Sequence, residues 1–225
     1  MMTRDVIFRS SAQYYSGING PTKAKQSIVD FCRDRAGKTI LDLGCATGNY
    51  CLALEELGFE CIGVDINREY VDIARKRGVR ALPIDGSLPF SEKSFDTIIM
   101  LEVLEHVEDL DKLLCEVKRV ARKNVLLTVP NNTGYELLRQ HKLTFEHMLE
   151  DDHVNFFTKD SLNALLAQYF PLCSIKEDEP IFPHGLLPWY LRKPISLCIR
   201  FSLVKALVYF RLYAECHIEA PLNKP

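Results

Sequence analysis

Short apolar runs alternate with helix-like segments from about Thr39 onward, and this alternation most limits how the chain can fold. Strands are predicted at Thr39–Leu43, Glu60–Val64, Val79–Pro83, Phe95–Leu101, Asn124–Val129 and Leu172–Lys176, with a last one at Cys216–Ala220. Helices are predicted at Asn49–Leu57, Arg68–Arg77 and Asp160–Tyr169, the second of them capped by Asn67. Strands separated by helices of this length pair in parallel, with crossovers on both faces of the sheet. The pattern therefore predicts an α/β fold with an open, doubly wound sheet.

The overall composition narrows the classes of function. The formal net charge is -2, so the chain lacks the cationic field that normally gathers nucleic acid. The eight cysteines are scattered, without CxxC or zinc-finger spacing, and we interpret them as reduced and mostly buried. The N-terminus lacks the apolar core of a secretory signal, and no apolar run approaches the roughly 18 residues of a membrane span. We therefore expect a cytoplasmic protein.

The stretch ILDLGCATGNY, residues 40–50, contains the turn that follows the first predicted strand. An open parallel sheet binds its ligands at the carboxyl ends of the strands, near the point where strand order reverses. A dinucleotide site would have G-x-G-x-x-G here, but the chain has only Gly44 and Gly48, with Asp42 just ahead of them. A carboxylate disfavours phosphate and favours a cationic group such as an amino-acid ammonium.

The motif DLGCATG resembles the first motif of the class I S-adenosylmethionine (SAM)-dependent methyltransferases, which usually have a glycine where this chain has Ala46. Asp65, in GVDIN, is similar to the family acid that accepts both ribose hydroxyls of SAM. Asp85, in LPIDGSLPF, is similar to the acid that contacts the adenine amino group. The resemblance covers roughly Lys38 to Pro130.

This resemblance implies a Rossmann-like, mostly parallel seven-stranded sheet with helices on both faces and a helical C-terminal insertion. It implies one domain, with a helical cap at 1–37, a cofactor-binding half at 38–130 and an acceptor-binding half at 131–225. The implied SAM-binding residues are Asp42, Gly44, Cys45, Ala46, Gly48, Asp65, Ile66, Asp85, Gly86, Leu101 and Glu102. A simpler alternative for Asp42 and Asp65 is that they only cap the helices that follow them.

Glu102, Glu105 and His106 form an E-x-x-E-H motif after the fourth strand, and this spacing on a helical turn would gather them on one face. With His153 from DDHVNFFT, the motif resembles the ubiquinone-biosynthesis O-methyltransferases and the RNA 2′-O-methyltransferases of small-RNA 3′ ends. All four residues are then candidate ligands of magnesium, manganese or zinc. Glu105, His106 and His153 are the candidate catalytic groups, and either histidine could act as a general base without metal. The alternative is that Glu102 and His106 only line the pocket floor and cap the next helix.

The segment from about residue 186 to 214 contains five basic residues and no acid, among several aromatic residues. One interpretation is a basic amphipathic element that contacts an anionic membrane or a lipid-linked substrate. The other, which we favour from the sequence, is an insertion that packs over the acceptor pocket with its bases reaching into water.

The function expected from these features is methyl transfer from SAM to a small-molecule, lipid-linked or glycan-linked acceptor, most simply at an oxygen. Metal-assisted 2′-O-methylation of an RNA ribose is an alternative, although the charge disfavours nucleic acid. A noncatalytic SAM-fold module at a membrane is another. A nicotinamide oxidoreductase would share Asp65 but needs the missing glycine.

Overall fold

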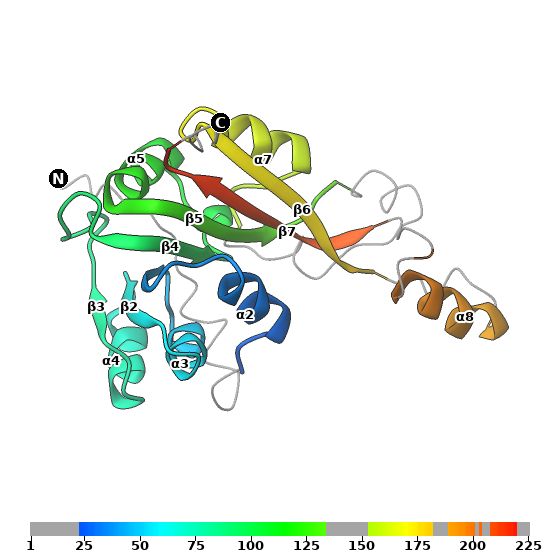
Figure 1. Ribbon diagram of the computed structural model, residues 1–225, viewed down its shortest axis with the longest axis horizontal. Helices are drawn as coiled ribbons and strands as arrows, with labels where there is room; N and C mark the ends of the chain where they lie inside the picture. The colour runs from blue at the N-terminus through cyan, green and yellow to red at the C-terminus, as the bar shows by residue number, and fades with distance from the viewer. Residues whose placement is uncertain (1–22, 134–152, 182–188, 201–202, 204–207, 220–225) are drawn as a thin grey trace, which may run out of the picture.

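Seven strands form one sheet in the computed structural model, in the order β3-β2-β1-β4-β5-β7-β6 (Figure 1). The structure describes residues 23–133, 153–181, 189–200, 203 and 208–219. The strands are β1 (Thr39–Leu43), β2 (Glu60–Asp65), β3 (Ala81–Pro83), β4 (Phe95–Leu101), β5 (Ala121–Pro130), β6 (Leu172–Pro180) and β7 (Tyr209–His217). β1 to β5 pair in parallel, and β7 lies antiparallel between β5 and β6. The predicted mostly parallel, seven-stranded sheet is confirmed.

Helices cover both faces of this sheet. The covering helices include α2 (Gln26–Arg33), α3 (Asn49–Glu56), α4 (Arg68–Lys76), α5 (Leu110–Val120) and α7 (Lys159–Leu166), and the described residues also form the one-turn 3₁₀ helix η1 (Leu104–His106) and α8 (Trp189–Arg200). The predicted cap is confirmed, because the side chain of Asn67 accepts hydrogen bonds from the first backbone N–H groups of α4. The predicted helix at Asp160–Tyr169 is shorter and begins one residue earlier. No bounds were predicted for α5.

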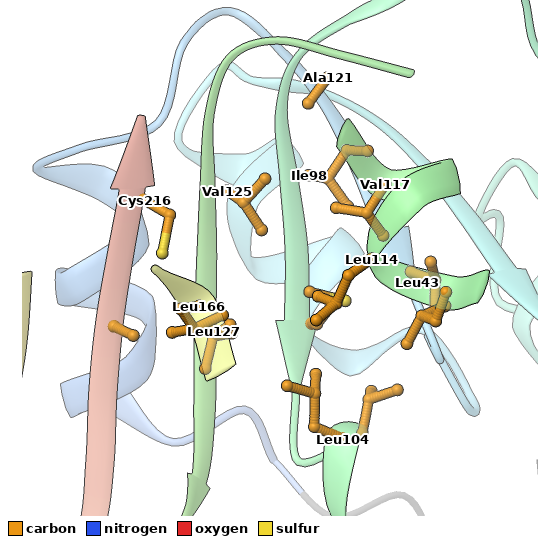
Figure 2. Packing of buried hydrophobic residues seen from close by; sticks show 14 of the residues in the cluster. Leu43, Ile98, Leu104, Leu114, Val117, Ala121, Val125, Leu127, Leu166 and Cys216 are labelled. Carbon is orange, nitrogen blue, oxygen red and sulfur yellow. The ribbon is translucent and has the colours of Figure 1, made fainter. Parts of the chain in front are cut away.

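One hydrophobic cluster lies under α5 and α7. Leu114 and Val117 of α5 and Leu166 of α7 pack against Ile98 and Val125 on one face of the sheet (Figure 2). A second cluster lies on the opposite face under α2, α3 and α4. The central strand β4 is buried along its whole length, as a strand covered on both faces must be. The layers fix the carboxyl ends of β1, β2, β4 and β5 along one edge.

The prediction for the last strand was wrong, because β7 begins at Tyr209 rather than at Cys216. Residues 209–214 therefore belong to the sheet and not to the predicted insertion at 186–214. Leu212 and Ala214 face one hydrophobic cluster while Tyr213 faces the other. The strand does show the period-two alternation, because the apolar Phe210, Leu212, Ala214 and Cys216 alternate with Arg211, Tyr213 and Glu215, and the sequence prediction missed this signal. Helix α8 is the helical part of the insertion.

Candidate functional site

The turn after β1 has the backbone conformation that its glycines suggest. Gly44 and Gly48 both have φ near 80°, and the backbone N–H groups of Gly44 and Cys45 donate to the carbonyl oxygen of Val64 at 2.8 and 3.0 Å. Ala46 also has a positive φ, 44°. A residue other than glycine pays roughly 1–2 kcal/mol for this conformation. Ala46 therefore carries this cost at a position where the family usually has glycine, and the turn forms in spite of it.

Two carboxylates lie at the ends of neighbouring strands beside this turn. Asp65 accepts hydrogen bonds from the backbone N–H groups of Ala46 and Asn67, both at 2.8 Å, and so joins the turn to α4. Asp42 is buried, and the thiol of Cys51 contacts its carboxylate at 3.3 Å. Burial raises the pKa of Asp42 to about 7 and also raises the pKa of Asp65. Within the described residues, no basic side chain pairs with either acid, so together they favour a cationic ligand.

The alternative that these acids only cap helices does not describe this geometry. The residue at the N-cap of α3 is Gly48, which makes no side-chain cap, and the N-cap of α4 is Asn67. Asp65 accepts from the N–H of Asn67 itself, one residue before the helix begins. Neither acid therefore satisfies the free N–H groups of a first helical turn.

The remaining predicted cofactor residues continue along the same edge of the sheet. Asp85 and Gly86 follow β3 in a loop that is tied to β2 by a 3.0 Å hydrogen bond from the Ile84 N–H to the Asp65 carbonyl. The Asp85 carboxylate is exposed and accepts from the Ser87 hydroxyl at 3.3 Å. Ile66 follows β2, and Leu101 is the last residue of β4. The ends of four strands thus supply the predicted set.

Glu102 departs from the predicted geometry. Its φ is 60°, and η1 begins only at Leu104, so Glu102 does not share a helical face with Glu105 and His106. Its carboxylate instead accepts two hydrogen bonds from the guanidinium of Arg211, at 2.8 and 3.0 Å. The left-handed backbone at Glu102 turns this side chain toward β7. The predicted four-ligand grouping is therefore wrong as geometry, because Glu102 stands apart from the other three residues.

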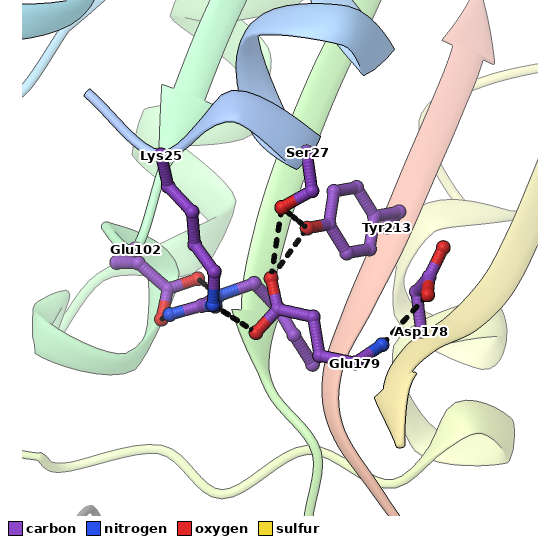
Figure 3. Close-up of polar contacts among 7 residues, drawn as sticks. Lys25, Ser27, Glu102, Asp178, Glu179 and Tyr213 are labelled. Atoms are coloured by element: carbon purple, nitrogen blue, oxygen red, sulfur yellow. Dashed lines mark hydrogen bonds and ion pairs between the residues drawn. The ribbon is translucent and has the colours of Figure 1, made fainter. Parts of the chain in front are cut away.

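Arg211 is the centre of a polar network that sequence analysis missed (Figure 3). It also forms an ion pair with Glu179 of β6, which in turn accepts from Lys25, Ser27 and Tyr213. Burial alone would raise the pKa of Glu179, but these hydrogen bonds and the Arg211 charge outweigh it and lower that pKa. The network joins the N-terminal edge of α2 to the last two strands. Its members come from four separate parts of the chain, at residues 25–27, 102, 179 and 211–213, so no local pattern could reveal them.

Glu105, His106 and His153 come together in a second polar group. Their ligand atoms all lie within 4.8 Å of one another, and the two imidazole ring centroids are 4.7 Å apart. Glu105 is buried and both histidines are half-buried. One carboxylate and two imidazoles suit a divalent cation such as manganese, zinc or iron(II), with open positions left for another ligand.

Asn155 fixes the segment that carries His153. The backbone N–H groups of Val154 and Asn155 donate to the Glu105 carbonyl at 2.8 and 3.0 Å. The Asn155 side chain donates to the carbonyls of Leu104 and Val107, at 3.0 and 2.6 Å. Sequence analysis did not identify Asn155, although its place in DDHVNFFT, two residues after a candidate histidine, was a usable signal.

The buried carboxyl of Asp42 gives a stability prediction. Because its pKa rises from 3.8 to about 7 on folding, the folded protein keeps a proton that the unfolded chain releases above about pH 4. The free energy of unfolding then falls as the pH rises from about 4 to 7. Asp42→Asn removes this titrating group. The free energy of unfolding of the variant should therefore exceed that of the wild type by on the order of 3 kcal/mol at pH 8 and by little at pH 4. Urea unfolding at both pH values measures it.

The matched control is Asp72→Asn, which changes an exposed carboxylate on α4. Its stability difference from the wild type should be the same at the two pH values. If the stability difference between Asp42→Asn and the wild type were also the same at the two pH values, Asp42 would be ionised in the folded protein at no cost, contrary to its burial.

A family model described as "Methyltransferase domain" matches residues 19–169. Human "Probable tRNA methyltransferase 9B" is 31% identical over 118 residues, which are 52% of this chain and 25% of that protein. Demethylmenaquinone methyltransferase of Tropheryma whipplei (strain Twist) is 35% identical over 99 residues, 42% of this chain and 41% of the relative. The chain thus spans less than half the length of these relatives.

The solved structures that resemble this one share its fold across most of the chain. YcgJ from Bacillus subtilis has a TM-score of 0.58 at 22% identity and covers 85% of this chain and 96% of its own. A SAM-dependent methyltransferase from Archaeoglobus fulgidus has a TM-score of 0.59 at 18% identity and covers 85% and 93%. These likenesses extend past residue 169, to strands that the family model does not reach.

Proposed function

The chain belongs to the class I SAM-dependent methyltransferases, and from this membership we propose that it transfers a methyl group from SAM to an oxygen of a small-molecule acceptor. The observation that carries the choice of oxygen is the cluster of Glu105, His106 and His153 at the carboxyl edge of the sheet. Such a cluster can hold or deprotonate a hydroxyl, which is a poor nucleophile until it loses its proton.

The residues at the carboxyl edge fit SAM. In this proposal Asp65 accepts the two ribose hydroxyls, and the buried carboxylate of Asp42 favours the ammonium end of the cofactor. Asp85, exposed at the end of β3, would accept the adenine amino group. When bound, SAM supplies an electrophilic methyl group on a sulfonium. The work left to the protein is to align the acceptor oxygen and exclude water, which lowers the barrier by several kcal/mol.

We propose that Glu105, His106 and His153 hold a divalent cation. Glu102 is not in this set, because Arg211 engages both of its carboxylate oxygens. The chemistry that such a cation supplies is Lewis acidity toward the acceptor hydroxyl. If the chain works without metal, His153 or His106 would take the hydroxyl proton as a general base.

Asn155→Ala tests how the cluster is positioned. Without the amide, two backbone carbonyls lose a donor and the His153 segment is held only through its backbone. We expect manganese or zinc affinity to fall about 10-fold or more, as for residues that orient metal ligands. Calorimetric titration with each metal measures this. Asn163→Ala, an exposed change on α7, is the control and should leave the affinity unchanged.

RNA ribose is a second candidate acceptor, because one similar protein is named as a tRNA methyltransferase. The net charge of -2 argues against it, since phosphate contacts supply most of the affinity for RNA. A noncatalytic module would bind neither donor nor acceptor. We also propose a cytoplasmic location, because eight free cysteines suit a reducing compartment.

A screen with radiolabelled SAM tests the proposed function. The purified chain would be incubated with pooled hydroxylated small molecules, lipid extracts and total tRNA, and each fraction counted for label. Label in a small-molecule or lipid fraction that survives mild acid and base is not a methyl ester, and mass spectrometry of the labelled product then shows whether the methyl group is on oxygen, nitrogen or carbon. Label only in tRNA would favour the second candidate, and absence of both label and calorimetrically detectable SAM binding would favour the noncatalytic alternative.

A further inference from the structure

Helix α8 stands apart from the helices that cover the sheet. In the chain it follows β6 and precedes β7. In space it projects from the body of the molecule, on the side away from α4 and α5 (Figure 1). Its sequence, WYLRKPISLCIR, contains three basic residues and no acid. The absence of acids extends through residues 186–214 of the sequence. The helix is therefore a local cationic element on a chain whose net charge is negative.

The outward face of α8 is mostly apolar. Tyr190, Lys193, Pro194 and Leu197 follow the i, i+3, i+4, i+7 spacing of one helical face, and all four are exposed. Tyr190 is 60% exposed and Leu197 is 55% exposed. A helix that meets only water normally turns its polar residues outward. The face that α8 presents is the kind that another surface normally covers.

The other side of the helix is also only partly covered. Ile195, Cys198 and Ile199 are half-exposed, so none of the α8 side chains whose exposure is described is fully buried. Leu203, just past the helix, is 74% exposed. The sequence had favoured an insertion buried over the acceptor pocket, and these exposures do not fit a buried helix. Large exposed apolar surfaces of this kind mark sites of protein or membrane contact.

We propose that α8 lies in the plane of an anionic lipid bilayer, with the face formed by Tyr190, Lys193, Pro194 and Leu197 toward the acyl chains and headgroups. Leucine and tyrosine side chains supply the apolar contact, and the bases of the segment attract anionic headgroups. The charge of α8 favours an anionic bilayer over a second copy of the chain as the partner of this face. Two copies of α8 facing each other would bring like charges together with no acid between them.

The length of α8 agrees with a helix that lies on the surface. Twelve residues of helix extend for about 18 Å, too short for the roughly 30 Å hydrocarbon core. Within the described parts of the chain, no helix is long and apolar enough to cross a bilayer. The strand that follows α8 reaches Arg211, which holds Glu102 at the site. A docked α8 would thus bring that edge of the site near the lipid surface, where a lipid-linked hydroxyl is the acceptor class that fits.

Co-sedimentation with vesicles tests the docking without any methyl donor or acceptor, so its outcome is independent of the proposed reaction. Vesicles of phosphatidylcholine alone are compared with vesicles containing 30% phosphatidylglycerol. The wild type is expected to sediment with the anionic vesicles, and high salt should weaken this binding. Leu197→Glu should reduce the bound fraction about 10-fold or more, because a leucine side chain is lost from the interface. Lys193→Glu should reduce it about fivefold or more.

Leu57→Glu is the matched control, because Leu57 is 48% exposed and lies after α3, away from α8. It should bind the anionic vesicles like the wild type. Circular dichroism melting of all variants checks that they fold. Equal binding to neutral and anionic vesicles, or undiminished binding by Leu197→Glu, would overturn the proposal. Failure of the wild type to sediment with the anionic vesicles would also overturn it, and a concentration-dependent dimer that Leu197→Glu abolishes would then identify a second copy of the chain as the occupant.

Discussion

Asp65→Asn is expected to weaken SAM binding about 30-fold or more, because one charged acceptor at the end of β2 becomes a neutral amide. A hydrogen bond to a charged group contributes roughly 1.5–3 kcal/mol, and the amide NH₂ cannot accept from a ribose hydroxyl. The asparagine keeps the shape of the side chain, and its one acceptor oxygen can keep one of the two hydrogen bonds that Ala46 and Asn67 donate to separate carboxylate oxygens. Isothermal titration with SAM and with its demethylated product measures the change.

Two controls separate donor binding from damage to the turn. Urea unfolding of Asp65→Asn should show that the fold survives. Asp85→Asn, at the exposed carboxylate after β3, should weaken SAM binding less than Asp65→Asn, because water competes for an exposed hydrogen bond. Unchanged SAM affinity in Asp65→Asn would remove the ribose role of this residue and, with it, the main support for the proposed donor site.

Removal of divalent metal is expected to abolish methyl transfer, and His153→Ala should lower the rate about 100-fold or more. The reason is that Lewis acidity toward the acceptor hydroxyl is worth several kcal/mol, and His153 is one of the three side chains that form the cluster within the described residues. The measurement is turnover of the acceptor found in the labelled-SAM screen, in EDTA and after manganese, zinc or magnesium is restored.

His217→Ala is the matched control for His153→Ala, because His217 lies at the far end of β7 and its side chain is 41% exposed. Its turnover should equal that of the wild type. Full activity in EDTA together with loss in His153→Ala would assign His153 the role of general base. Full activity of the wild type in EDTA, together with full activity of His153→Ala, would show that the cluster has no part in the reaction.

The sequence predicted the turn and the strand ends of the proposed donor site because their signals are local. The glycine turn, Asp42 and Asp65 lie within one crossover of the sheet, so a short motif and its spacing locate them. Ala46 shows the limit of this approach, because its positive φ follows from the turn as a whole and not from the identity of the residue.

The acceptor side was harder to predict because its contacts join distant segments. The positive φ of Glu102 cannot be predicted from the presence of a glutamate at this position. This backbone conformation keeps Glu102 off the helical face that the E-x-x-E-H spacing suggested. Arg211 was assigned to the helical insertion because its basic and aromatic surroundings were interpreted as an amphipathic element, although the alternation from Tyr209 to His217 is that of a strand. The predictions for residues 1–22 and 134–152, which include most of the N-terminal cap, concern residues outside the described structure.

The network around Arg211 bears on how this enzyme could be recombined with its relatives. The matched family region ends at residue 169, yet Glu102 within it depends on an arginine from β7, and β5 depends on β7 for a hydrogen-bonded neighbour. A chimera that joined residues 1–169 to a foreign C-terminal half would strand a carboxylate in a half-buried position and leave an open sheet edge. A chimera designed to change acceptor specificity should therefore take Glu102, Glu179 and Arg211 from the same parent protein.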